Sequence, residues 1–332
     1  MRYTIYHLAR FRFTAPVVEN VMEVRVQPCS DARQSCVDFS IVTRPAARVD
    51  TYVDHAGTQV HHFDIPGSHR ELSAIAVSLV DVVDGEPDPA LLPQSTWAEV
   101  DALADVLDFW DYLHSTPLTR TSELLCALAQ ELALDRSAPP LTTLLQLNTR
   151  LHRTLAYDME ATEVDSPIED ALQHRRGVCQ DYAHIMLALL RNHLHIPCRY
   201  VSGYLYHSTD DRSADGASHA WLEAWLPGYG WLGLDPTNNL PAGARHIRVG
   251  AGSDYHDVPP ARGVTVAAAV GDLLVRACPA QCARRGRGRG TERRSGPADV
   301  SHCHDQRWTP RPGRGPRRGP AATATTAAIN VQ

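Results

Sequence analysis

The spacing of the apolar residues changes twice along the chain, and this limits its fold more than any other feature. Up to about residue 90, short runs such as residues 3–8 and 74–80 alternate apolar and polar positions between turn residues, which is typical of half-buried strands. From about residue 95 the apolar residues recur at helical spacing, and beyond residue 156 one helical segment precedes several alternating ones. This order indicates an α+β chain.

We divide the folded part of the chain into three regions on this basis. Residues 1–92 are predicted to form a β-rich N-terminal domain, a small β-sandwich, because strand-like runs recur at regular intervals. Residues 93–138 are predicted to be a helical connector that begins at Ser95 or Thr96, residue types that cap helices. Residues 139–265 then form a second domain, with a helix followed by an antiparallel sheet.

The C-terminal segment has a different composition. Residues 266–332 are rich in arginine, glycine and proline, and we predict that they are disordered because they cannot bury enough apolar surface to fold. The alternating pattern stops abruptly here. We therefore hypothesise a shifted reading frame near residues 264–280, which resequencing would test, and expect an open sheet edge if a last strand is missing.

Charge is distributed unevenly along the 332 residues. All 32 basic residues are arginine. Residues 276–332 hold 12 arginines and three acids, a net charge of +9, so residues 1–275 hold 20 arginines and 35 acids, a net charge of -15. An acidic body disfavours nucleic acid as a partner. Only the arginine-glycine repeat at 284–290 offers sequence-independent attraction to phosphates.

The first residues and the hydropathy predict a location. The chain starts with an alternating segment instead of a continuous apolar one, and no stretch of 18 apolar residues follows. We expect neither a secretory signal nor a membrane span. A cytoplasmic protein with reduced cysteines is the resulting prediction.

Three segments carry side chains suited to nucleophilic chemistry. Cys179, in Arg-Gly-Val-Cys-Gln-Asp-Tyr, stands at a predicted helix start, where free amides and the helix dipole stabilise a thiolate. His219, in Ala-Ser-His-Ala-Trp, begins one predicted strand, and Asp235, in Leu-Gly-Leu-Asp-Pro-Thr, ends the next. Adjacent antiparallel strands can bring His219 and Asp235 together. The carboxylate would then fix the ring so that its other nitrogen faces the sulfur.

These motifs resemble those of bacterial transglutaminase-like cysteine enzymes, in which a helix cysteine, a strand histidine and a strand aspartate follow in this order on a papain-like fold. The resemblance covers residues from about 157 to 264. It extends to the first 90 residues, which are similar to the β-rich N-terminal domain associated with this core. It implies that Cys179 is the nucleophile, that His219 transfers protons and that Asp235 orients His219. Neither a metal nor an organic cofactor is implied.

Four further residues near these motifs are candidates for substrate binding or for an oxyanion site. They are Gln180, Asp181, Tyr204 and Trp221. Asp181 lies in the first turn of the predicted helix, where an acid also complements the dipole. For the aromatic residues, core packing is the alternative to lining an acyl-donor groove. The backbone amide of Cys179 is the expected oxyanion donor, and the sequence indicates no second one.

The activity expected from these features is acyl transfer through a thioester at Cys179, from a glutamine or peptide amide to an amine or water. Two alternatives stay open at this point. A peptidase or amidase would hydrolyse amide bonds with the same three residues, and a non-catalytic binding module could use the same scaffold. In each case a protein or peptide is the expected partner, without a membrane, and the sequence indicates no oligomeric state.

Overall fold

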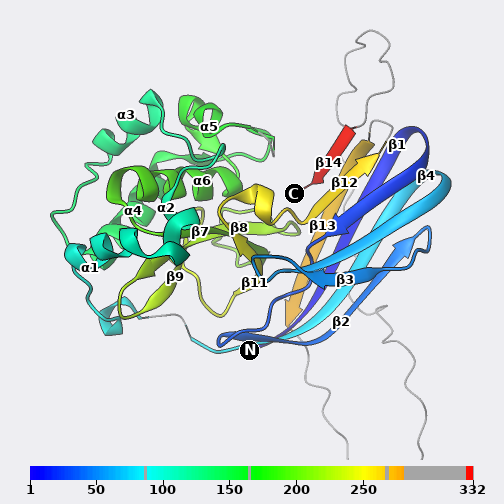
Figure 1. Ribbon diagram of the computed structural model, residues 1–332, viewed down its shortest axis with the longest axis horizontal. Helices are drawn as coiled ribbons and strands as arrows, with labels where there is room; N and C mark the ends of the chain where they lie inside the picture. The colour runs from blue at the N-terminus through cyan, green and yellow to red at the C-terminus, as the bar shows by residue number, and fades with distance from the viewer. Residues whose placement is uncertain (86–87, 164–165, 266–268, 280–326, 332) are drawn as a thin grey trace, which may run out of the picture. The chain divides into compact units, whose positions relative to one another are not determined.

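The computed structural model describes residues 1–85, 88–163, 166–265, 269–279 and 327–331. One compact unit comprises residues 1–280 and 326–332, and the remaining residues, 281–325, lie outside the described ones. Within the first unit one sheet contains the N-terminal strands, and a second sheet lies among the helices (Figure 1). The predicted α+β class is confirmed.

The first sheet contains seven strands and combines both ends of the described chain. β1 and β4 pair along most of their length, β2 and β3 extend β4, and the C-terminal strands extend β1. The strands are β1 (Arg2–Val24), β2 (Gln34–Arg44), β3 (Asp50–Val53), β4 (Gln59–Val82), β12 (Ala261–Thr265), β13 (Ala269–Pro279) and β14 (Ala327–Val331).

The predicted sandwich takes the form of one sheet that is bent at its middle. The short runs expected as separate strands are the two halves of β1 and of β4, which arch together in Figure 1. Register shifts between Arg12 and Val17 mark the bend, since irregular pairing bends a strand locally. Phe11 from one half and Met22 and Phe63 from the other belong to one buried apolar cluster. The two halves of the sheet therefore share one core.

The predicted start of the C-terminal tail, residue 266, is too early, because strands follow it in the chain. Residues 269–279 form β13, which pairs with β1 from Phe13 to Tyr3, and residues 327–331 form β14, which pairs with β12. The physical reason is the unpaired edge of β1, whose backbone groups gain partners when an extended segment is added. The β1 edge that would be open if a last strand were missing is therefore paired. The arginine-glycine repeat lies outside the described residues, and its disorder and the frame shift stay predictions.

The helices surround the second sheet, and their caps follow the sequence in part. Thr96 caps the first helix through a reciprocal pair of bonds with Glu99. The helical segment is then interrupted at Val106, whose backbone is extended. No helix among the described residues is long and apolar enough to cross a bilayer. The helices are α1 (Trp97–Asp101), α2 (Trp110–Leu113), α3 (Glu123–Glu131), α4 (Pro140–Thr154), α5 (Ile168–His174) and α6 (Cys179–Leu189), with 3-10 helices at Pro89–Leu91, Ala102–Asp105, Leu107–Phe109 and Tyr255–Asp257 and a π-turn at Leu190–Leu194.

The second sheet has five antiparallel strands in the order β10-β9-β8-β7-β11. Helix α6 packs against it, and every residue of α6 is buried. A separate parallel pair, β5 with β6, lies directly before α6 in the chain. The strands of the two are β5 (Ala156–Tyr157), β6 (Arg176–Gly177), β7 (Cys198–Leu205), β8 (His219–Leu226), β9 (Gly230–Asp235), β10 (Leu240–Pro241) and β11 (His246–Gly252).

Candidate active site

Helix α6 begins at Cys179, and the turn before it is held by a buried carboxyl group. Asp181 Oδ2 accepts hydrogen bonds from the Val178 amide at 2.8 Å and from Thr162 Oγ1 at 2.5 Å. A Cβ on Gly177 would lie 2.6 Å from that same oxygen, so glycine leaves the room that the carboxyl group needs. Burial raises the pKa of Asp181 to about 6. Asp181 therefore positions the start of the helix, which was the structural alternative for this residue.

Strands β8 and β9 bring His219 and Asp235 together as the sequence predicts. His219 Nε2 lies 2.8 Å from Asp235 Oδ2, and both side chains are buried. Burial alone would lower the pKa of His219. The Asp235 charge and hydrogen bond, followed by Cys179, raise it instead to about 10. The ring is therefore a cation at neutral pH, and Asp235 is its counter-ion.

Cys179, the first residue of α6, is buried, and it lies close enough to His219 to help raise the pKa of that ring. Because Nε2 is bound to Asp235, Nδ1 is the nitrogen left for another partner. The fold thus brings His219 and Asp235 into contact and Cys179 into their neighbourhood.

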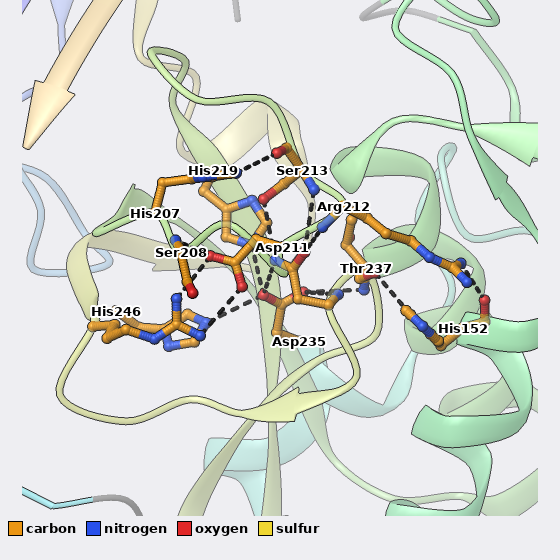
Figure 2. A network of polar contacts seen from close by, with 12 residues as sticks. His152, His207, Ser208, Asp211, Arg212, Ser213, His219, Asp235, Thr237 and His246 are labelled. Carbon is orange, nitrogen blue, oxygen red and sulfur yellow. Dashed lines mark hydrogen bonds and ion pairs between the residues drawn. The ribbon is translucent and has the colours of Figure 1, made fainter.

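The Asp235 carboxylate is surrounded by donors, as Figure 2 shows. Oδ1 accepts the amides of Thr237 and Asn238 at 3.0 and 3.1 Å, and Oδ2 accepts the Asn238 side chain at 2.8 Å. Burial would raise the pKa of Asp235, but His219 and then His246 hold it well below its usual range. The group is ionised despite its complete burial, since each oxygen has several partners.

His246, on β11, is a residue that the sequence analysis missed. Its Nε2 lies 3.2 Å from Asp235 Oδ2, and its Nδ1 accepts a hydrogen bond from the Gly243 amide at 3.2 Å. Because an amide can only donate, Nδ1 carries no proton and Nε2 donates to Asp235. Burial, the largest cause, lowers the pKa of His246. It is thus a neutral donor, unlike His219.

Asn238 links this carboxylate to the loop between β7 and β8. Its Nδ2 donates to both Asp235 Oδ2 and Ser213 Oγ, while its Oδ1 accepts the amides of Arg212 and Ser213. Figure 2 shows the loop residues Ser213 and His207 joined to this network. The loop therefore has a fixed position next to His219. The Asp-Pro-Thr-Asn turn was the available signal, since aspartate often accepts the amides that follow it.

Tyr157, on β5, is the second residue that was missed. It pairs in register with Gly177, two residues before Cys179. Burial, and after it the neighbouring Cys179, raises its pKa to about 12. Its oxygen accepts a hydrogen bond from the Ala214 amide at 3.1 Å, so its own proton is available to another acceptor. Only the folded chain brings this tyrosine close to Cys179.

Of the remaining candidates, Trp221 lies next to the site and Tyr204 does not. The Trp221 ring packs on His219, with the ring centroids 6.0 Å apart and nearly parallel. The Tyr204 hydroxyl donates to Val26 O at 2.8 Å, and its ring belongs to a buried cluster with residues of the first sheet. A substrate role for Tyr204 was therefore wrong, because strand alternation turns it toward that sheet. Gln180 is buried at the start of α6.

His219, Asp235 and His246 also form the one group in the described part of the chain whose atoms could converge on a metal ion, all within 4.8 Å of one another. The two ring nitrogens, however, both lie at hydrogen-bond distance from one carboxylate oxygen. A metal ion would need bonds of about 2 Å to each ligand and would displace that oxygen from both rings. The arrangement fits a hydrogen-bonded network better than a metal centre.

Comparison with known proteins identifies the family. Residues 127–236 match the model of the transglutaminase-like superfamily, and residues 3–81 match that of the bacterial transglutaminase-like N-terminal region. The chain belongs to the transglutaminase-like superfamily. An uncharacterized protein of Mycobacterium leprae is 34% identical to this transglutaminase-like chain over 277 residues, 82% of this chain and 96% of the other.

Two further relatives differ in how much they share. A protein-glutamine gamma-glutamyltransferase of Pseudomonas aeruginosa is 32% identical over 139 residues, 38% of this transglutaminase-like chain but 19% of that protein. The crystal structure of a candidate cysteine protease from Cytophaga hutchinsonii has a TM-score of 0.69 at 19% identity, covering 84% of this chain and 91% of that one. This structural likeness establishes the fold across both domains.

Proposed function

We propose that this chain catalyses acyl transfer through a thioester on Cys179, from a glutamine or peptide amide to an amine or water. One observation supports this more than any other. The His219 ring is hydrogen-bonded to Asp235, and Cys179, at the start of α6, is near enough to affect the pKa of that ring. A nucleophile, a base and an orienting carboxylate close together are the parts that covalent acyl transfer requires.

In the first half-reaction the Cys179 thiolate attacks the amide carbon. As the tetrahedral intermediate collapses, the carbon–nitrogen bond breaks and the His219 imidazolium gives its proton to the leaving nitrogen. Ammonia leaves from a glutamine side chain, or an amine leaves from a peptide bond. The products are a thioester and a neutral imidazole. Before the proton was transferred, Asp235 stabilised the positive charge of the imidazolium.

In the second half-reaction an amine or water attacks the thioester. His219 accepts the proton that the attacking atom loses, and the carbon–sulfur bond breaks to restore the thiolate and imidazolium. We assign the stabilisation of the negative oxygen of each intermediate to the Cys179 amide at the helix start and to the Tyr157 hydroxyl, since preorganised donors stabilise developing charge.

The choice between an amine and water is tested by measuring two products on one substrate. A glutamine peptide and a fluorescent primary amine are incubated with the protein, and amine incorporation is followed together with ammonia release. The absence of lysine from the chain removes self-labelling through its own side chains. Equal rates of both products indicate transamidation. Ammonia without incorporation indicates hydrolysis by the same residues.

Variants decide whether Cys179 is the nucleophile. Replacing Cys179 by alanine should abolish both products, whereas Cys126→Ala, at a half-buried free cysteine in α3, should leave both rates unchanged. Unchanged ammonia release in Cys179→Ala would contradict the proposal. If the wild type forms neither product and an acylating thiol probe does not label Cys179, the chain is the non-catalytic module instead.

A further inference from the structure

Three arginines line an open hollow of about 560 Å³ beside Tyr157. Arg153 stands near the end of α4, Arg175 directly follows α5, and Arg212 belongs to the loop between β7 and β8. Residues 154–157 complete the lining. Segments far apart in the sequence thus bring three guanidinium groups to one concave surface.

The positive charge of this hollow is mostly uncompensated. Arg175 Nη2 lies 2.6 Å from Glu131, which neutralises one charge. Arg153 is exposed, and no acidic side chain within the described ranges pairs with it or with Arg212. A surplus of two positive charges is notable because residues 1–275 carry a net charge of -15. The hollow is therefore a local positive site on an acidic body.

Hydrogen bonds hold the Arg212 side chain in place, although no acidic side chain among the described residues neutralises its charge. Its Nη1 donates to the backbone oxygens of His152 and Leu155 at the end of α4, at 2.5 and 3.2 Å, and Figure 2 shows the side chain reaching His152. Carbonyls hold the group without neutralising it. A guanidinium that is already ordered loses less entropy when it binds an anion.

The hollow lies next to the candidate nucleophile. Tyr157 lines the hollow and also interacts electrostatically with Cys179. The backbone confirms the proximity, since the Ala156 amide donates to Arg175 O at 2.9 Å and Tyr157 pairs with Gly177. A group bound in the hollow and a carbonyl at the sulfur can therefore belong to one extended substrate.

We propose that this hollow binds a carboxylate of an acidic peptide, and that the same peptide supplies the amide attacked by Cys179. Guanidinium groups match carboxylates through paired hydrogen bonds. An amine acceptor carries positive charge and is repelled here, so the hollow serves the acyl donor. A long polyanion such as nucleic acid is disfavoured by the acidic body, whereas a short acidic peptide is not. The inference rests on the proposed function for its substrate class.

The test measures binding in the Cys179→Ala variant, which needs no chemistry. Two labelled peptides contain one glutamine each and differ only in flanking residues, aspartate in one and asparagine in the other. We expect the aspartate peptide to bind about fivefold more tightly at low salt, since one partly exposed ion pair contributes up to roughly 1 kcal/mol. The difference should shrink as salt is added.

Two arginine variants identify the hollow as the cause. Arg153→Gln, in the Cys179→Ala background, should remove most of the preference for aspartate, because it removes one of the two positive charges that no described acidic side chain neutralises. Its side chain is exposed, so the fold should not change. Arg176→Gln is the matched control, since Arg176 pairs with Asp158 at 3.1 Å and does not line the hollow. Equal binding of both peptides, or equal loss in both variants, would overturn the inference. The inference would also be overturned if a single-stranded oligonucleotide displaced the labelled acidic peptide at a lower concentration than the unlabelled acidic peptide does.

Turnover separates this inference from the proposed function. With active protein, Arg153→Gln should raise KM for the aspartate peptide about fivefold and leave kcat unchanged. If the protein turns over both peptides equally well, the hollow has no such role and the acyl transfer stands. If the acidic peptide binds to Cys179→Ala but the wild type releases no ammonia or amine from it, the proposed function fails by itself.

Discussion

His246 donates a hydrogen bond to Asp235 through Nε2 at 3.2 Å, on the oxygen that His219 contacts at 2.8 Å. One buried carboxylate thus serves two imidazoles in different charge states. The pKa of His219 is raised to about 10, whereas burial lowers that of His246. The negative charge of Asp235 is therefore committed to His219, and His246 acts as a neutral donor that fixes the carboxylate.

Replacing His246 by phenylalanine tests this division of roles. The buried carboxylate loses one donor, so the free energy of unfolding should fall by about 1–3 kcal/mol. We expect kcat to fall roughly tenfold, because a misplaced carboxylate orients His219 less well. His246→Gln, which can still donate, should recover part of both losses. Urea unfolding and steady-state kinetics measure them, with His174→Phe at an exposed histidine as the control. Wild-type activity in His246→Phe would remove His246 from the account.

Replacing Asn238 by a charged residue should lower the activity more than truncating its side chain to alanine. Asn238→Ala removes the donor to Asp235 and the tie to Ser213, so proteolytic cleavage of the loop at residues 207–217 should become faster. Asn238→Asp keeps the shape but places a second carboxylate against Asp235. Like charges in a buried site repel, so its activity should be lower than that of Asn238→Ala. The opposite order would contradict the donor role.

The Asp181 carboxyl group predicts a pH dependence of stability. Its pKa is raised from 3.8 to about 6 in the folded protein, so the folded state binds the proton more tightly than the unfolded state does. Its contribution is fully present below about pH 4 and is lost as pH rises through about 6. Asp181→Asn should therefore gain on the order of 1–3 kcal/mol over wild type between pH 4 and pH 7.

Urea unfolding of both proteins at several pH values in this window measures that difference. The exposed Asp111 in the first turn of α2, whose charge does not act on Asp181, provides the matched control, and Asp111→Asn should show no comparable trend. A constant difference between wild type and Asp181→Asn across the window would show that burial does not shift this carboxyl group.

The Tyr157 hydroxyl is predicted to act on the intermediates and not on substrate binding. Tyr157→Phe keeps the ring that lines the hollow and removes only the oxygen. Loss of one oxyanion donor should lower kcat by about 10²–10³, with little change in KM. The Ala214 amide also loses its acceptor, so unfolding is measured alongside. A rise in KM at constant kcat would assign the hydroxyl to binding instead.

The contact between His219 and Asp235 could be predicted from the sequence because the two residues begin and end adjacent strands joined by a short turn. The position of Cys179 at a helix start could be predicted because an apolar helical segment follows it. His246 and Tyr157 lie outside the motifs of these three residues. Each reaches the site through a pairing that only the fold creates, β11 with β7 and β5 with β6. Tyr204 shows the converse. It lies near these motifs in the sequence, but its side chain packs toward the first sheet.

The sequence predicted that the first sheet consists of strands, but it did not predict how long those strands are. The short runs expected as separate strands join across Pro16 in β1 and across Pro66-Gly67 in β4, and the pairing of the two strands shifts register in this part. β13 was missed for a different reason. Its neighbour, β1, lies more than 250 residues earlier in the chain, and this long-range pairing leaves little local trace beyond a short apolar run.

The most direct test of the central claim is the mass of the acyl-enzyme. The protein is mixed with a glutamine peptide, quenched in acid after a short time and weighed intact, and the adduct is then mapped by digestion. We predict a gain equal to the peptide minus ammonia, located on Cys179, and a rate of formation lower by about 10²–10⁴ in His219→Gln, because proton transfer is lost. Failure to form the adduct, or its location on Cys29 or Cys126 instead, would contradict the account.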